Sequence, residues 1–235
     1  MNYDMKKILL FAALACGVLS GWAQVSFNID SLAQQAQAGN ANAQYELGEC
    51  YENGLSVDQD YGKAFGWYLK AAQQNLAKAQ LSLGYCYQEG LGVEADEATA
   101  AAFFLQAASQ GLAEAQYCIS TCYEDGRGVK ANERLAAEWA LKSAQQGYAM
   151  AQYNMGYYCD NGIGVPKKHK DAVAWYQKAA EQGVAEAQFI IGSFYKLGYG
   201  VEQSPQTAMF WLKKAAEQGI EVAAEALAEL EAEQK

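Results

Sequence analysis

The chain has 235 residues, of which 51% are apolar and 19% are charged, so it is long enough to bury a sizeable core. Its formal net charge is −10. This charge argues against binding to nucleic acid, because an acidic surface repels a phosphate backbone, and it favours a basic partner instead.

The first 23 residues have the pattern of a secretory signal peptide. Two lysines precede an apolar run that ends at Leu19, and the small residues Gly21 and Ala23 stand before a cleavage site at Gln24. This run is too short for a membrane-spanning helix, and no other stretch of the sequence predicts one. We therefore expect export to the periplasm or beyond the cell, with a lipoprotein anchored at Cys16 as the alternative.

The rest of the chain is built on a repeat of 36 residues. The pair Ala43-Gln44 recurs without an insertion as Ala79-Gln80, Ala115-Gln116, Ala151-Gln152 and Ala187-Gln188. Five units are therefore predicted at 41–76, 77–112, 113–148, 149–184 and 185–220. Residues 24–40 resemble the end of a unit and predict a half-repeat or capping helix. Residues 221–235 begin a further unit and then depart from it, which predicts a C-terminal capping helix, with a self-association face as the alternative.

Each unit predicts two helices joined by a glycine-containing turn. In the first unit, residues 43–53 place Leu47 and Cys50 on one face of a helix, which we expect to be buried. The second helix is expected to start at a column of capping residues, which holds Asp60, Asp96, Asn132, Lys168 and Ser204. Because a lysine side chain cannot accept a hydrogen bond, the helix after Lys168 is expected to start elsewhere, with Asp171 as the candidate.

Two further columns have roles in packing. A column of small residues is expected to let the paired helices approach closely, and it holds Gly48, Gly84, Ser120, Gly156 and Gly192. A column of aromatic residues is expected to fill the core of each hairpin, and it holds Trp67, Phe103, Trp139, Trp175 and Trp211. Neither column requires a catalytic explanation.

The pattern of residues 149–165, AMAQYNMGYYCDNGIGV, and of residues 172–180 resembles the Sel-one-like repeat, a relative of the tetratricopeptide repeat. The other units match the same pattern closely. The resemblance implies an all-α fold, a right-handed α-solenoid of helix-turn-helix repeats, in which the first helices line a concave surface. It also implies an adaptor that holds another protein.

Function is expected on the concave face, where the repeat constrains the sequence least. The variable positions there are acidic, with tyrosines in the middle units, which suits a protein or peptide partner of basic character. The candidate partner-binding residues are Glu49, Glu52, Tyr85, Glu89, Tyr117, Glu124, Asp125, Tyr153, Tyr157 and Asp160. Tyr85 and Tyr157 are the better contact candidates, because the column of Tyr117 and Tyr153 belongs to the repeat pattern and is expected to pack between repeats.

The cysteines after residue 23 predict buried thiols, and they are Cys50, Cys86, Cys118, Cys122 and Cys159. Three of them are equivalent positions on successive first helices, whose axes pack about 8–10 Å apart. A disulfide needs Cα atoms within about 7 Å, so these three cysteines are expected to lie too far apart to form one. Some secreted relatives join the two helices of each hairpin by a disulfide, but the second helices here contain no cysteine. The cysteine spacing also does not predict a zinc site.

No catalytic constellation accompanies the repeat, so we predict a scaffold that is not an enzyme and needs no cofactor or metal. The only histidine, His169, lies in a basic run that predicts a solvated loop. Ser193 and Lys196 match the S-x-x-K motif of penicillin-reactive enzymes, without its companion motifs. A β-lactamase-like or cell-wall-acting enzyme is therefore one alternative, and a module that binds peptidoglycan or another glycan through exposed tyrosines is a second.

Overall fold

The computed structural model describes residues 28–233, and the expected signal peptide, Cys16 included, lies outside this range. The described residues form twelve α-helices and no strand. Their bounds are α2 (Ile29–Gln37), α3 (Ala41–Asn53), α4 (Tyr61–Gln73), α5 (Ala77–Glu89), α6 (Glu97–Ser109), α7 (Ala113–Asp125), α8 (Glu133–Gln145), α9 (Ala149–Asn161), α10 (His169–Glu181), α11 (Ala185–Leu197), α12 (Pro205–Glu217) and α13 (Glu221–Glu233).

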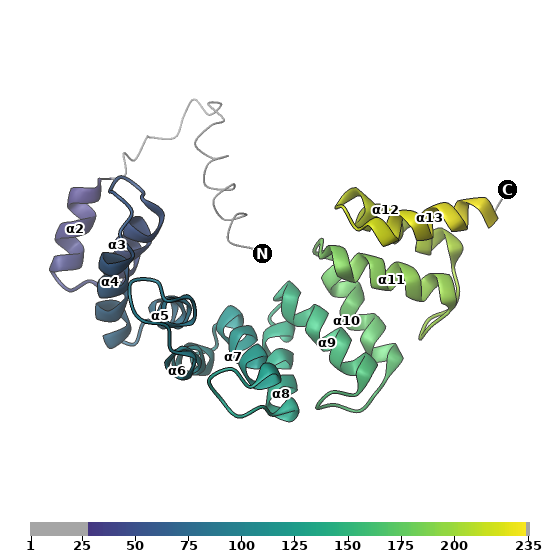
Figure 1. Ribbon diagram of the computed structural model, residues 1–235, viewed down its shortest axis with the longest axis horizontal. Coiled ribbons are helices and arrows are strands. Elements are labelled where there is room, and N and C mark those ends of the chain that lie inside the picture. The colour runs from purple at the N-terminus through teal and green to yellow at the C-terminus, as the bar shows by residue number, and fades with distance from the viewer. Residues whose placement is uncertain (1–27, 234–235) are drawn as a thin grey trace.

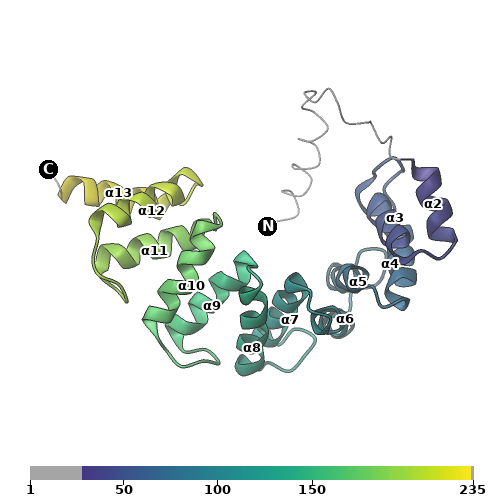
Figure 2. The ribbon, with the colours of Figure 1, turned by 180° about the vertical axis from the view of Figure 1, so that it is seen from behind.

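The helices stack as hairpins along an arc (Figures 1 and 2). Each first helix packs against the second helix of its own unit and against the second helix of the unit before it. In the middle of the arc, α5 and α7 lie toward the inner side and α6 and α8 toward the outer side (Figure 1). The prediction of an all-α solenoid of helix-turn-helix repeats is confirmed.

The helix after Lys168 starts where the other second helices start, so the prediction of a start near Asp171 was wrong. α10 begins at His169, and Lys168 has the extended backbone of a capping residue but makes no capping hydrogen bond with its side chain. Its backbone N–H donates to the carbonyl of Cys159, 2.8 Å away, and Asp60 donates to Tyr51 in the same way. This backbone hydrogen bond to the preceding helix therefore positions the start of the second helix, and the start does not require a capping side chain.

The core of each hairpin is filled by a different column from the one predicted. Trp67 and its equivalents in the next three units are only half-buried, and Trp211 alone is buried. The residue that follows is fully buried instead, and this column holds Tyr68, Phe104, Ala140, Tyr176 and Leu212. A Cβ atom added to Gly84 would lie 2.4 Å from the ring of Phe104, so the close approach predicted for the glycines is confirmed.

The third unit has a larger residue in place of the glycine and a smaller residue in place of the ring. Ser120 replaces the glycine, and its hydroxyl donates to the carbonyl of Ala136 at 2.9 Å. Ala140 replaces the ring, which leaves room beside Ser120. Tyr158 of α9 is fully buried in the same core cluster as Ala140, and its hydroxyl donates to Glu124 of α7 at 2.7 Å. A residue of the fourth unit thus completes the core of the third.

In units two to five, the turn within the unit packs against the unit before it. Gly128 has a φ of +67°, and a Cβ atom there would lie 1.9 Å from the carbonyl oxygen of Glu97, the first residue of α6. Only glycine combines this positive φ with so close a backbone contact. The turn that follows α7 is therefore held in place at the start of α6.

Two columns of glutamines join successive units. The buried Gln152 donates Nε2 to the carbonyl of Ala144 at 3.2 Å, and its Oε1 accepts a hydrogen bond from Nε2 of Gln182 at 2.7 Å. Nε2 of Gln182 also donates to the carbonyl of Gly147 at 2.9 Å. The accepting glutamines are Gln44, Gln80, Gln116, Gln152 and Gln188, and their respective donors are Gln74, Gln110, Gln146, Gln182 and Gln218. The donor column shares the 36-residue period, but sequence analysis did not single it out.

Replacing Gln152 by methionine preserves the approximate size of the side chain and removes its hydrogen bonds. The carbonyl of Ala144 and one amide hydrogen of Gln182 then lose their partner. We expect the free energy of unfolding to fall by about 1–3 kcal/mol, as measured by urea denaturation followed by circular dichroism. The control is Gln145→Met at an exposed position of α8, with an expected change within about 0.5 kcal/mol. Equal losses in the two variants would contradict this role.

Candidate functional site

The inner and outer helices differ in charge. The first helices α3, α5, α7, α9 and α11 carry nine carboxylates and two lysines, whereas the second helices α4, α6, α8, α10 and α12 carry six carboxylates and eight lysines or arginines. In the middle of the arc, where α5 and α7 lie toward the inner side (Figure 1), this difference places negative charge on that side. This inner surface is the candidate site.

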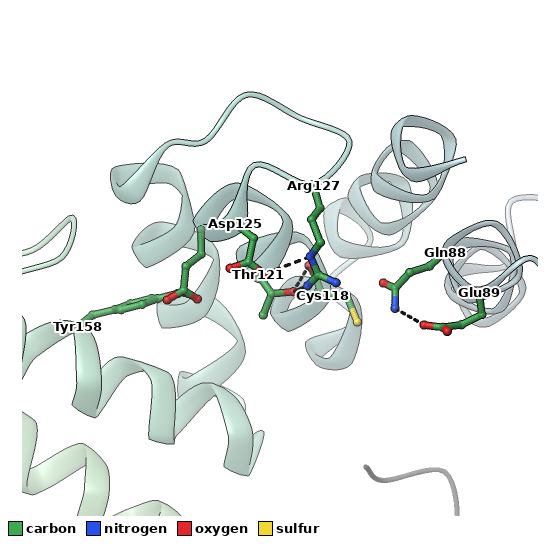
Figure 3. A network of polar contacts seen from close by, with 8 residues as sticks. Gln88, Glu89, Cys118, Thr121, Asp125, Arg127 and Tyr158 are labelled. Carbon is green, nitrogen blue, oxygen red and sulfur yellow. Dashed lines mark hydrogen bonds and ion pairs between the residues drawn. The ribbon is translucent and has the colours of Figure 1, made fainter. Parts of the chain in front are cut away.

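Several of the acidic residues that were predicted to contact a partner instead accept hydrogen bonds from tyrosines of the protein itself. Glu52 accepts a hydrogen bond from the hydroxyl of the buried Tyr68, and Glu49 accepts one from Tyr45 at 2.8 Å. Glu124 accepts the hydroxyl of the buried Tyr158 at 2.7 Å (Figure 3). Burial, together with the neighbouring carboxylate, raises the pKa of Tyr68 and of Tyr158 far above the ordinary range, so both hydroxyls remain donors.

Two of the acidic residues that were predicted to contact a partner are exposed to solvent. Glu89 and Asp125, the last residues of α5 and α7, are exposed. Glu89 accepts a hydrogen bond from Gln88 at 2.7 Å, and Asp125 forms an ion pair with Arg127 (Figure 3). Glu186 of α11, outside the predicted set, is exposed as well. These carboxylates are therefore accessible to a partner in a way that Glu124 is not.

The predicted tyrosines divide in the same way. The hydroxyl of Tyr85 donates to Glu114 at 3.1 Å and lies 3.1 Å from Sγ of Cys118, both in the next unit, while its ring packs edge-on against Phe104. Tyr117 and Tyr153 are half-buried against other tyrosine rings, and burial raises the pKa of both. Tyr157, at 43% exposed, is the one of these four that presents its ring to solvent.

His169 does not lie in a solvated loop, so that prediction was wrong. It is the half-buried first residue of α10, and its Nδ1 lies 2.7 Å from Oδ1 of Asp160. Its Nε2 lies 3.1 Å from the hydroxyl of Tyr199 in the next unit. Asp160 is thereby engaged inside the protein as well. No local motif signals this arrangement, because Tyr199 reaches His169 only through the stacking of units.

The cysteines match their prediction. All five in the described range are free and buried. Burial raises the pKa of Cys50 to about 11 and those of Cys86 and Cys118 to about 12, so the thiols stay protonated at neutral pH. Within residues 28–233, no group of three or more histidine, cysteine or acidic side chains is arranged to hold a metal ion.

The S-x-x-K motif does not assemble a nucleophile in the described structure. The hydroxyl of Ser193 donates to the carbonyl of Phe189 in its own helix at 2.9 Å. The ammonium of Lys196 pairs with Glu229 of α13 at 2.7 Å. No hydrogen bond joins Ser193 to Lys196 among the described residues, so the lysine is not placed to activate the serine.

The stacked hairpins and their periodic columns define a tandem-repeat α-solenoid. A sequence model of the Sel1 repeat matches residues 41–76, 77–112, 113–148, 149–184 and 185–220. The chain therefore belongs to the Sel1-repeat family, whose fold is that of a scaffold suited to protein interactions. Within the described residues, none of the helices combines the length and apolar character needed to cross a bilayer.

Solved structures of the family are similar. The Escherichia coli protein c5321, described as a protective antigen of uropathogenic strains with an SLR fold, is 35% identical with a TM-score of 0.83 over 86% of this chain and 44% of its own. This chain thus spans less than half of that protein. A Sel1 repeat protein from Oxalobacter formigenes is 29% identical with a TM-score of 0.77 over 95% of this chain and 85% of its own. No curated protein matches the chain.

Substitutions at Tyr85 and Tyr157 distinguish a packing residue from a surface residue. Tyr85→Ala removes a ring packed on Phe104 and two polar contacts with the next unit, and we expect the free energy of unfolding to fall by about 3 kcal/mol. Tyr157→Ala removes an exposed ring, and we expect a loss of about 1 kcal/mol or less. Urea denaturation measures both. A larger loss for Tyr157→Ala would reverse the two assignments.

Proposed function

We propose that this protein is a non-enzymatic scaffold that binds a basic segment of another protein along the inner face of its solenoid. The observation that carries the proposal is the separation of charge between first and second helices. An inner surface of one sign attracts a segment of the opposite sign and orients it during the encounter.

Three features of the inner face support this proposal. The exposed carboxylates of Glu89 and Glu186 come from the second and the fifth unit, so an extended partner would meet charge along its length. Tyr157 adds an exposed ring between them, which can pack against the stem of a lysine or stack on an arginine. The glutamines of both columns donate to carbonyls of the preceding unit and hold the units in register, so little conformational freedom is lost when a partner binds.

Charge reversal tests the proposal with a matched control. The inner variant carries Glu89→Lys and Glu186→Lys, and the outer variant carries Glu181→Lys and Glu217→Lys at exposed positions of α10 and α12. Both variants change the net charge equally. We expect a labelled peptide of alternating lysine and serine to bind the native protein and the outer variant, and to bind the inner variant about tenfold more weakly, as measured by fluorescence anisotropy.

Two outcomes would contradict the proposal. Equal weakening in both variants would mean that net charge alone attracts the peptide. Binding of an otherwise identical peptide of glutamate and serine, as tight as that of the basic peptide, would mean that charge complementarity plays no part. Cross-linking of the tagged protein in its native envelope, with the same variants beside it, then identifies the natural partner.

We also propose that the protein acts outside the cytoplasm. The proposal rests on the sequence of residues 1–23, which has the basic start, apolar run and small residues of a secretory signal. Mass spectrometry of the protein purified from cell envelopes or medium is expected to find a chain that begins at Gln24. A lipid-modified chain that begins at Cys16 would replace this proposal with that of a lipoprotein, and an intact N-terminus in the cytosol would contradict both.

A further inference from the structure

Arg127 breaks a column that is otherwise without charge. The equivalent positions in the other units hold Leu55, Leu91, Ile163 and Tyr199. Arg127 lies in the turn after α7, and a short apolar side chain serves at the same place in two neighbouring units. Packing of the repeat therefore does not require an arginine here.

The guanidinium of Arg127 lies close to α7 (Figure 3). Its Nη2 is 3.5 Å from the hydroxyl oxygen of Thr121, which belongs to the same column as Tyr85 and Tyr157. The side chain extends from the turn toward the end of α5, where Gln88 and Glu89 lie (Figure 3). A positive charge is thus placed beside Thr121 in the middle unit, in a column that the sequence assigns to the inner face.

The protein's own groups use only part of this guanidinium. Nε of Arg127 lies 3.1 Å from Oδ2 of Asp125. Nε is buried, and its geometry relative to Asp125 is not that of a hydrogen bond. The contact with Thr121 is at the limit of a hydrogen bond, and no described residue accepts one from Nη1. The side chain is 41% exposed. The outer edge formed by the two Nη atoms, which pairs with carboxylates in bidentate fashion, is therefore available to a ligand.

We propose that Arg127 sets the register of the bound segment by selecting an acidic residue, flanked by basic residues, opposite the turn after α7. This inference rests on the proposed function. A lysine or arginine of the partner placed there would meet a like charge, which disfavours that register. A glutamate or aspartate there pairs with the guanidinium, while the basic residues on either side meet the carboxylates of the inner face.

Three labelled peptides of equal length test this on the native protein. The first alternates lysine and serine, the second replaces the central lysine by glutamate, and the third replaces a terminal lysine by glutamate. The second and third have the same composition and net charge, so only the position of the carboxylate differs. We expect the native protein to bind the centrally substituted peptide at least about threefold more tightly than the terminally substituted one, as measured by fluorescence anisotropy.

The variant Arg127→Leu introduces the residue found at two equivalent positions, so the fold is expected to be retained. Its preference between the two glutamate peptides should disappear, and it should bind the all-basic peptide more tightly than the native protein does. Arg134→Leu is the control, because Arg134 is 79% exposed on α8 and lies on an outer helix. It removes the same charge and should preserve the preference.

The outcomes separate this inference from the function on which it rests. If the native protein binds the basic peptides but does not distinguish the two glutamate peptides, or if Arg127→Leu retains the preference, the register proposal is wrong and the basic-segment proposal stands. If the native protein binds none of the basic peptides, both are wrong. The comparison on the native protein decides the matter even if Arg127→Leu fails to fold.

Discussion

The hydrogen bonding of buried glutamines is the constraint on which the rest of this solenoid depends. A buried amide is costly unless both its donor and its acceptor are satisfied, and Gln152 satisfies them only when the neighbouring second helices supply Ala144 and Gln182 in one arrangement. The same pairing recurs from Gln44 to Gln188. Each unit is thereby held at one position relative to the next, and an insertion within a unit would separate the two columns.

This fixed stacking gives the inner face its properties. With the units in register, exposed carboxylates such as Glu89 and Asp125 recur on the inner helices of successive units, together with the exposed ring of Tyr157. The same stacking brings Tyr158 to Glu124 and Tyr85 to Glu114, so part of the acidic surface holds neighbouring units together. The exposed charges are therefore held at fixed positions relative to one another, as the proposed binding of an extended segment requires.

Much of the fold could be predicted from the sequence because the same residue types recur at the same spacing in each unit. The period, the paired helices, the close approach at Gly84 and the buried thiols all follow from residue types at fixed spacing. The candidate site was less predictable. Glu52 and Tyr85 look like surface residues on a helical wheel, but each contacts a side chain of another helix, and a wheel drawn for one helix contains no information about the next.

The sequence by itself determined the family, the number of units and the acidic character of the chain, because these depend on composition and on periodicity along the chain. Only the tertiary structure decided whether Trp67 or Tyr68 enters the core, since adjacent residues of a helix differ only in their direction about its axis, and packing against the neighbouring helix sets that rotation. It also decided which acidic and aromatic residues remain exposed, because Asp160, His169 and Tyr199 come together only when two units stack.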